Sequence, residues 1–295
     1  MKVRPIGNGI AIEVLGLKLW EPIAEHVLAS LADLWSKSGV IVFRRQALGE
    51  AEIVQFSRQF GELDIIVRTD WQSECHPEIT QISNMKNSSG RSIGGLGAGE
   101  LDWHSDQSYM CEPATGSLLY MVEMPRDGGR TYWANLSLAY ASLPKATKQL
   151  IEGKHGVFDY LKRQSTYDDE APMSAELRRK TPVVAHPLVN RHPVTGAPSL
   201  YLDPTTTVGI AEMPGEEGDR LLAELNAHAT QPQYVYAHDW QIGDVVMWDN
   251  GFVLHRRDPF DQVSNRLLKR TTFRLPSSRH IVPTGYEMAA QVSVT

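Results

Sequence analysis

His104 and Asp106 stand one residue apart in the stretch Leu101-Asp102-Trp103-His104-Ser105-Asp106. On an extended strand, residues i and i+2 point to the same face, so this spacing predicts that the two side chains project side by side. An imidazole nitrogen and a carboxylate oxygen placed in this way are two adjacent ligands for a divalent metal ion. We therefore interpret the pair as part of a metal site.

A third ligand is expected from a histidine elsewhere in the chain, because a His-x-Asp pair alone is a weak signal. His255 is the best candidate, since it follows an apolar run at 245–248, a turn-forming Asp-Asn-Gly and a second apolar run. A polar side chain that emerges from such an apolar hairpin needs a partner, and a metal ion is a suitable one. Two histidines and one carboxylate form the facial triad of non-haem Fe(II) oxygenases, which leaves coordination positions open on one side of the metal.

The elements that must position these side chains are predicted from the periodicity of apolar residues. Helical spacing predicts helices over 23–35, 53–60, 138–151 and around 221–225. Short apolar runs predict strands over 10–14, 40–43, 117–123, 129–134, 200–202, 245–248 and 271–275. Irregular and helical insertions separate these strands, which favours an antiparallel sandwich or barrel with helical decoration over a doubly wound parallel sheet.

The composition is that of a globular protein with a large core. The 295 residues are 42% hydrophobic and 22% charged, and the net charge of −6, without a basic run, argues against a nucleic-acid partner. Cys75 and Cys111 lack CxxC spacing, so we interpret them as free thiols, with one disulfide as the alternative. The chain shows no secretory signal and no stretch near the ~20 apolar residues of a membrane span, so a cytoplasmic protein is expected.

Two long segments without hydrophobic periodicity are predicted to be loops. The first, about 84–100, is rich in glycine and ends just before His104, whereas the second, about 160–182, is rich in charge. Long loops in compact domains are usually lids or linkers. The position of the first loop favours a mobile flap over the site, and a surface loop without a role is the alternative. Its glycines lack the GxxxxGK[ST] pattern of a phosphate-binding loop.

Four separated motifs resemble one known family. They are WHSD at 103–106, GGRT at 128–131, WDNGFVLHR at 248–256 and NRLLKRTTFRL at 265–275. In this order and spacing they are similar to the taurine dioxygenase and phenoxyacetate-herbicide dioxygenase group of Fe(II)/2-oxoglutarate enzymes. The resemblance extends from about residue 39 to 275. It implies that His104, Asp106 and His255 are the iron ligands.

The resemblance also assigns residues to the cosubstrate, 2-oxoglutarate. Thr131 and Arg266 fall on the residues that hold its distal carboxylate. Arg270 falls on an arginine that lines the iron site, close to the cosubstrate and to an anionic group of the substrate. A planar guanidinium suits this task because it binds a carboxylate through two parallel hydrogen bonds. The even spacing of 266, 268 and 270 predicts that both arginines lie on one face of a strand.

The function implied by the resemblance is that of an oxidoreductase. Such an enzyme would use Fe(II), 2-oxoglutarate and O2 to oxidise, most simply to hydroxylate, a small organic substrate that bears an acidic group, and would release succinate and CO2. The implied fold is a single domain over 1–295, mainly β with α decoration, in which helices flank a double-stranded β-helix (jelly-roll) core. Because family members are often dimers or tetramers, a homo-oligomer is compatible with the resemblance.

Glu100 departs from the family pattern, because sulfonate- and phenoxyacetate-using members commonly carry asparagine at this position. A carboxylate here could receive a substrate ammonium or guanidinium while Arg270 binds an acidic group, which suggests the hypothesis of a zwitterionic substrate. A solvated Glu100 is an equally supported alternative. Further candidates for the substrate pocket are Asn84, Tyr109, Tyr201 and Thr206. Core packing is the commoner fate of such aromatic residues.

Other functions remain as alternatives. The triad also suits a hydrolytic zinc site, but the chain has no HExxH, and zinc leaves Thr131 and Arg266 without a purpose. A non-catalytic jelly roll that binds a small molecule is disfavoured by the complete triad. Within the oxygenase interpretation, desaturation or cleavage of a carbon–heteroatom bond is the alternative to hydroxylation, because the placement of the target hydrogen decides the outcome.

Overall fold

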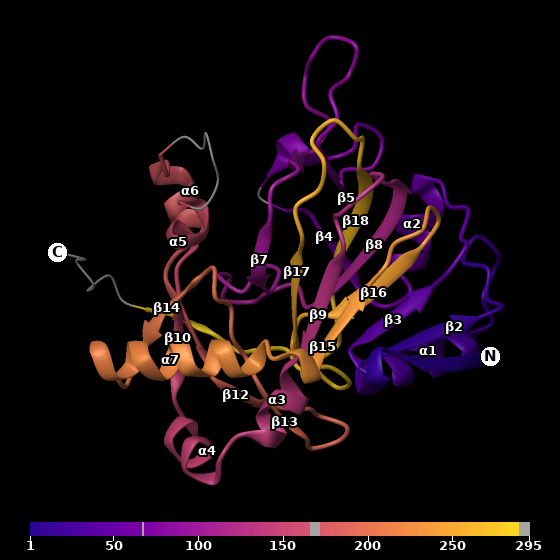
Figure 1. The fold of residues 1–295 in the computed structure, drawn as a ribbon. Helices are drawn as coiled ribbons and strands as arrows, with labels where there is room; N and C mark the ends of the chain where they lie inside the picture. Colours follow the sequence, from indigo (N-terminus) through magenta and orange to yellow (C-terminus); the bar gives the residue numbers. More distant parts are fainter. Residues whose placement is uncertain (67, 166–171, 289–295) are drawn as a thin grey trace.

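Two β-sheets face each other at the centre of the molecule (Figure 1). The structure, a computed structural model, describes residues 1–66, 68–165 and 172–288. The larger sheet contains, in spatial order, β1 (Lys2–Ile6), β2 (Ala11–Leu15), β3 (Val40–Phe43), β16 (Val245–Asp249), β8 (Gly116–Glu123), β18 (Leu267–Arg274), β5 (Ile79–Ser83) and β6 (Gly95–Leu96), and β4 (Glu62–Asp64) pairs with β18. The facing sheet contains β15 (Val235–His238), β9 (Thr131–Asn135), β17 (Val253–Arg257) and β7 (Leu101–His104).

The chain passes repeatedly from one sheet to the other. After β5 and β6 in the larger sheet it forms β7 in the facing sheet, returns for β8, and crosses again for β9 and β15. It then forms β16 in the larger sheet, β17 in the facing sheet and β18 in the larger sheet. Within the described residues the paired strands are antiparallel except β2 with β3 and β5 with β6. The predictions of a mainly β fold and of mostly antiparallel strand pairing are confirmed.

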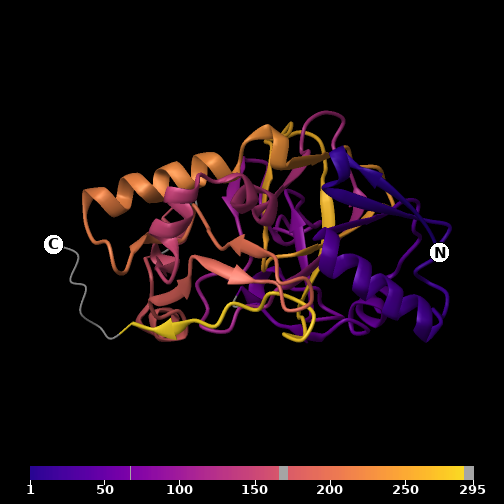
Figure 2. The ribbon, with the colours of Figure 1, turned by 90° about the horizontal axis from the view of Figure 1, so that it is seen from below.

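Helices and two small sheets surround this centre. The helices are α1 (Glu25–Ser38), α2 (Glu50–Ser57), α3 (Leu136–Ser142), α4 (Lys145–Ile151), α5 (Tyr160–Gln164), α6 (Ala175–Lys180) and α7 (Glu216–Ala229), and the 3-10 turns are η1 (Gly7–Gly9), η2 (Thr69–Trp71) and η3 (Pro232–Tyr234). The small sheets are β14 (Thr207–Ile210), β10 (His155–Phe158), β11 (Val184–Pro187) and β19 (Tyr286–Glu287), and β12 (Val189–Arg191) with β13 (Pro198–Leu200). Figure 2 shows indigo α1 and orange α7 at opposite ends of the molecule. None of the helices in the described ranges is long and apolar enough to cross a bilayer.

Strand β16 is buried on both faces of the larger sheet, which explains its unbroken apolar sequence. Val246 and Trp248 pack in the cluster between the two sheets, together with Trp133 from β9. Val245 and Met247 belong to the cluster on the other face, which α1 and α2 cover. The central strand is therefore held from both sides, and its end is a fixed point from which the chain turns toward the site.

The predicted elements are largely confirmed, with differences that have physical causes. Each predicted strand overlaps an observed one, and α1 ends at Gly39, whose φ is 77°. The predicted helix over 138–151 is wrong as one element: α3 and α4 are separate because Leu143, which precedes Pro144, has an extended ψ of 145°. Both cysteines are free thiols, as predicted.

The two predicted loops differ from expectation in their local structure. The first, about 84–100, contains β6 and a bridge between Lys86 and Ser92. The second, about 160–182, contains α5 and α6 on either side of 166–171, and residues 166–171 lie outside the described residues. The charge-rich composition of this segment therefore concealed two short helices, one of which, α6, begins at a Ser174 side-chain cap.

The sequence suggested that the apolar runs before His255 form a hairpin, and this prediction is wrong. Strands β16 and β17 belong to different sheets, and the turn at 249–252 carries the chain from one to the other. Gly251 lies in this crossing turn, where a Cβ would sit 2.1 Å from the carbonyl oxygen of Ile281. The turn therefore requires glycine because backbone from a distant part of the chain packs directly against it.

We predict that Gly251→Ala destabilises the fold by about 1–3 kcal/mol, because a methyl group must displace a backbone carbonyl. Gly209→Ala is the matched control, since nothing lies within 4 Å of a Cβ at Gly209. Chemical denaturation followed by circular dichroism measures both variants. Equal unfolding midpoints for Gly251→Ala and the wild type would show that the crossing turn tolerates a side chain.

Candidate metal and cosubstrate site

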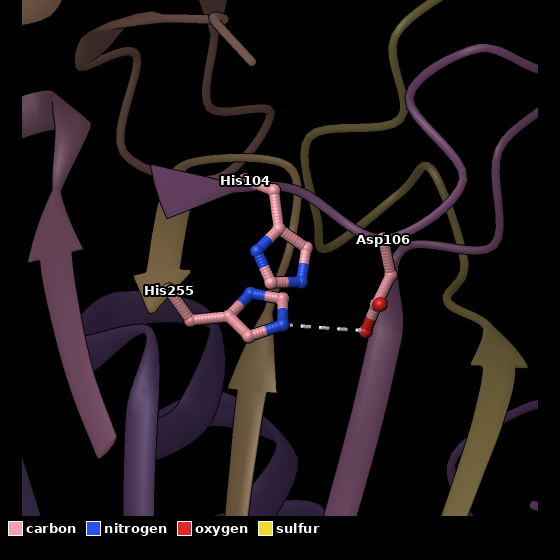
Figure 3. Close-up of side chains that lie close together, drawn as sticks. All are labelled: His104, Asp106 and His255. Carbon is pink, nitrogen blue, oxygen red and sulfur yellow. Dashed lines mark ion pairs between the residues drawn. The ribbon is translucent and has the colours of Figure 1, made fainter. Parts of the chain in front are cut away.

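His104 and Asp106, which are close in sequence, converge with the distant His255 between the sheets (Figure 3). His104 is the last residue of β7 and lies directly across from His255 in the register of β7 with β17. Their rings are 4.0 Å apart, and His255 Nε2 lies 3.9 Å from Asp106 Oδ2. One ligand atom from each residue lies within 4.8 Å of the others. The three side chains are buried, so they form a compact donor set for one metal ion.

Asp106 reaches this position from a turn and not from a strand. The prediction that His104 and Asp106 share one strand face is wrong, because β7 ends at His104. Two side chains from distant segments hold this turn in place. Asp106 N–H donates to Asn250 Oδ1 at 3.2 Å, and Ser105 N–H donates to Asp203 Oδ2 at 3.2 Å. These bonds fix the backbone, so the carboxylate is brought to the two histidines by a folded turn.

Hydrogen bonds also orient the donor atoms. His104 Nδ1 lies 2.7 Å from the carbonyl oxygen of Asp102, which fixes that nitrogen as the donor and leaves Nε2 as the ligand atom. Ser117 Oγ donates to Asp106 Oδ2 at 2.7 Å, and Asn250 Nδ2 donates to Ser117 Oγ at 3.0 Å. Asn250 therefore holds both the backbone and, through Ser117, the side chain of Asp106.

The electrostatic environment deprotonates all three groups. Burial lowers the pKa of His255 to about 4 and holds the pKa of His104 well below its usual value. Burial alone would raise the pKa of Asp106, but Arg270, followed by the two histidines, outweighs it and holds that pKa below its usual value. Arg270 Nη1 lies 2.8 Å from Asp106 Oδ1. Two neutral imidazoles and a carboxylate are the forms that a divalent cation binds.

A cavity beside the triad contains the residues predicted for the cosubstrate. Both histidines, Thr131, Arg266 and Arg270 line it. Leu268 also lines it, so the prediction that positions 266, 268 and 270 share one face is confirmed, although Arg266 itself precedes β18. Arg266 is 2% exposed; its Nη2 donates to the Gly129 carbonyl at 3.3 Å, and its buried Nε has no partner. A buried guanidinium with an unpartnered N–H fits a carboxylate ligand.

A second cavity lies on the other side of Asp106. Arg68, Arg163 and Arg270 line it together with Asp106, and its walls are aromatic, including Tyr109 and Tyr160, whose rings are 4.4 Å apart. Arg163 also lines an outer cavity of about 360 Å³, together with His104 and Glu100. The structure thus brings Tyr109 to the triad and places Glu100 at the outer opening, where its carboxylate lies 3.4 Å from Arg256.

Three predicted pocket residues do not reach the triad. Asn84 lines a separate cavity; it donates to the carbonyl oxygens of Gln262 and Ser264 and accepts from Arg266 N–H at 2.9 Å. Tyr201 is a core residue, 1% exposed, that packs on other aromatic rings, and the hydroxyl of fully buried Thr206 bonds to Ser108. These side chains support residues of the site without lining the cavities beside the triad, and Asn84 does so by fixing the backbone at Arg266.

Several residues of the site were not predicted from the sequence. Ser117 and Asn250 hold Asp106, and Arg163 lines both the arginine-rich cavity beyond Asp106 and the outer cavity. Arg257 lines the cosubstrate cavity with Arg266. Strand alternation gives a signal for Arg257, since it stands two residues after His255 and so shares its face.

Comparisons with known proteins show the family to which this chain belongs. Residues 2–272 match the family model described as taurine catabolism dioxygenase TauD, TfdA family. The chain is 34% identical over 245 residues to the alpha-ketoglutarate-dependent 2,4-dichlorophenoxyacetate dioxygenase of Burkholderia sp. (strain RASC), covering 80% of this chain and 82% of the relative. It is 30% identical over 272 residues to pentalenolactone F synthase of Streptomyces avermitilis, covering 86% and 83% of the two chains.

Solved structures agree with the sequence relatives. AAD-2 in complex with Mn(II) and N-oxalylglycine superposes with a TM-score of 0.78 at 30% identity, covering 93% of this chain and 97% of that one. A taurine dioxygenase from Burkholderia xenovorans superposes with a TM-score of 0.77 at 29% identity, covering 98% and 95%. The protein therefore belongs to the TauD/TfdA family of Fe(II)- and 2-oxoglutarate-dependent dioxygenases.

Proposed function

We propose that this dioxygenase hydroxylates a small organic acid, and that Arg270 and Arg163 bind the anionic group of that acid. The observation that carries the proposal is the lining of the cavity beyond Asp106, where Arg163 and Arg270 lie with aromatic walls beside one acidic residue, Asp106, and where the third arginine, Arg68, is paired with Asp70. If Asp106 is engaged by a metal ion, an arginine-rich cavity attracts a second anion. Relatives named for 2,4-dichlorophenoxyacetate and phenoxypropionate act on molecules of this class, a carboxylate on an aromatic body.

His104, Asp106 and His255 are the proposed ligands of Fe(II), and Thr131 and Arg266 are proposed to bind the distal carboxylate of 2-oxoglutarate. With both groups bound, the site supplies the oxidation: O2 and 2-oxoglutarate yield succinate, CO2 and one oxygen atom for a substrate C–H bond. The triad is held from behind, so iron would meet a donor set that needs little rearrangement. This preorganisation is supported by the bonds of His104 to Asp102 and of Asp106 to Ser117.

The protein's own contribution is to orient and to exclude water. The guanidinium of Arg266 is buried and planar, and it can bind a carboxylate through two parallel hydrogen bonds. A carboxylate bound there therefore has a fixed direction. Trp248 lies 4.7 Å from the His255 ring and closes the inner wall of the site. Arg270, bonded to Asp106, lies between the cosubstrate cavity and the arginine-rich cavity, because it lines both. It thus positions the iron ligand and faces the anionic group of the substrate.

The two facing sheets are proposed to be the double-stranded β-helix (jelly roll) of one domain over 1–295. This is supported by the repeated crossing of the chain between the sheets: β7, β9, β15 and β17 lie in the facing sheet, and β8, β16 and β18 lie in the larger sheet. The segments at about 84–100 and 160–182 are proposed as lids, because Glu100 and Arg163 from them line the outer cavity beside His104. The site therefore lies inside the sandwich, and both lids border its opening.

A substrate screen tests the proposed function. Fe(II)-loaded enzyme is supplied with 2-oxoglutarate, O2 and pairs of compounds that share one body, each acid being matched by its neutral methyl ester. We expect succinate release to rise with an aryloxyalkanoate or related organic acid, together with stoichiometric hydroxylated product, and not with the ester. Equal stimulation by acids and esters would contradict the anionic substrate, while leaving the cofactor chemistry intact.

Arg163→Gln tests the anion site. Because hydrogen bonds to a charged group are strong, we predict a rise of about tenfold or more in KM for the acid substrate, with KM for 2-oxoglutarate unchanged. Arg179→Gln is the control, since Arg179 is an exposed arginine on α6. Steady-state succinate assays measure both constants. A parallel rise in both KM values, or none, would remove Arg163 from the substrate site.

Ser117→Ala tests the support of Asp106. Loss of the hydroxyl that donates to Asp106 Oδ2 is predicted to weaken Fe(II) binding by about tenfold or more. Thr272→Val is the matched control, because Thr272 lies opposite Ser117 in β18 and its buried hydroxyl has no partner. Anaerobic competition with a chelator measures the dissociation constants. Wild-type affinity in Ser117→Ala would show that the carboxylate needs no such support.

A further inference from the structure

Arg257 shares the cosubstrate cavity with Arg266. The two side chains are 3% and 2% exposed, and their guanidinium carbons lie 5.1 and 5.3 Å from the centre of the Phe260 ring. Buried Nε and Nη1 of Arg257, like Nε of Arg266, have no hydrogen-bond partner. The atoms that accept from these guanidiniums in the described residues are backbone carbonyl oxygens. Two cations therefore lie together in a buried space without an acidic side chain between them.

This arrangement is unfavourable until an anion is present. Burial lowers the pKa of Arg257 to about 10, and burial together with the charge of Arg257 holds the pKa of Arg266 well below its usual value. A buried charge normally has a partner of opposite charge, and these two guanidiniums have only backbone carbonyls as acceptors among the described residues. A carboxylate placed between them would use the free N–H groups of both. A cavity lined by both arginines therefore suits an anion better than a cavity lined by one arginine would.

The strand register places Arg257 where this anion would lie. Arg257 is the last residue of β17, on the same face as His255, and it pairs with Thr131 of β9. Thr131 is the second residue proposed for the distal carboxylate of 2-oxoglutarate, and it lines the same cavity. Arg257, Thr131 and Arg266 therefore surround one end of that cavity, and His255 stands at the other.

Arg257 also holds the glycine-rich segment. Its Nη2 donates to the carbonyl oxygen of Leu96 at 3.0 Å and to that of Gly99. Strand β6 in this segment pairs with β5 over two residue pairs, and Leu96 has a positive φ of 68°, so little regular structure holds it. One guanidinium thus connects a cavity wall to the segment 94–99, which leads into β7 and His104.

We propose that Arg257 is a second cosubstrate residue and a positioning residue for the segment 94–99. Its Nη1 donates to the distal carboxylate of 2-oxoglutarate beside Arg266, while Nη2 keeps its bonds to Leu96 and Gly99. A bound dicarboxylate then immobilises the guanidinium and, through it, the segment over the site. Cosubstrate binding and closure of this flap are coupled through one side chain. The proposal rests on the proposed function, because it takes 2-oxoglutarate as the ligand of the Arg266 cavity.

Calorimetry on the Mn(II)-loaded enzyme without O2 tests the binding role. The ligands are 2-oxoglutarate and 2-oxobutanoate, which keeps the metal-chelating end and lacks the distal carboxylate. For Arg257→Gln we expect the Kd of 2-oxoglutarate to rise about tenfold or more and the Kd of 2-oxobutanoate to stay unchanged. Arg257→Lys keeps the charge but lacks the planar guanidinium, so its Kd for 2-oxoglutarate should lie between those of the wild type and Arg257→Gln. Arg91→Gln, an exposed arginine on the same loop, is the control and should match the wild type.

The pattern of these constants separates the possible failures. If the wild type binds both acids equally, the Arg266 cavity does not hold the distal carboxylate and the proposed function fails at that point. If the wild type prefers 2-oxoglutarate and Arg257→Gln keeps the full preference, Arg257 has no part in binding and the present inference alone is overturned. A rise in Kd for both acids would mark a general structural defect and would also overturn it.

Amide hydrogen exchange tests the coupling in the wild-type protein, which avoids any folding defect of a variant. At saturating concentrations, 2-oxoglutarate is expected to slow exchange in the peptide that covers 94–99, whereas 2-oxobutanoate is expected to leave it unchanged. In Arg257→Gln, saturating 2-oxoglutarate should give no protection. Equal protection by both acids in the wild type, or protection that survives in Arg257→Gln, would contradict the coupling.

Discussion

The cross-strand pairing of His104 with His255 is the constraint on which the rest of the site depends. It joins the first strand of the facing sheet to a strand formed about 150 residues later, and it sets the two imidazoles 4.0 Å apart. The buried strand β16 and the tight turn at Gly251 aim β17 into this register. A shift of one residue would turn His255 to the opposite face of the sheet, so strand register and metal site are specified together.

Charge balance explains the residues around that pairing. The triad has one carboxylate, Asp106, and three arginines lie near it, Arg257, Arg266 and Arg270, of which Arg270 is paired with it. Buried guanidiniums without an acidic partner destabilise the folded protein. They persist in a site because a bound anionic ligand supplies the missing partner. The excess of positive charge is consistent with the two proposed anions: a dicarboxylate in the cosubstrate cavity and an acidic substrate in the arginine-rich cavity beyond Asp106.

The sequence could predict the donor types and the sheet class, because strand alternation and motif spacing are local signals. For the same reason it predicted that Arg266 and Arg270 lie on one face. It could not predict that Asp106 sits in a turn, because that turn is held by Asn250 and Asp203 from distant segments. Nor could it separate Tyr109, which lines a cavity, from Tyr201, which packs in the core, since burial depends on tertiary neighbours.

The most direct test of the central claim is an anaerobic titration of the apoprotein with Fe(II) and 2-oxoglutarate, followed by visible absorption. Chelation of the iron by the 2-oxo acid gives a charge-transfer band that reports the metal, its ligands and the cosubstrate together. We expect a saturable band with one iron per chain in the wild type and no band in a folded His255→Ala variant. An undiminished band in His255→Ala would contradict the assignment of the metal to this triad.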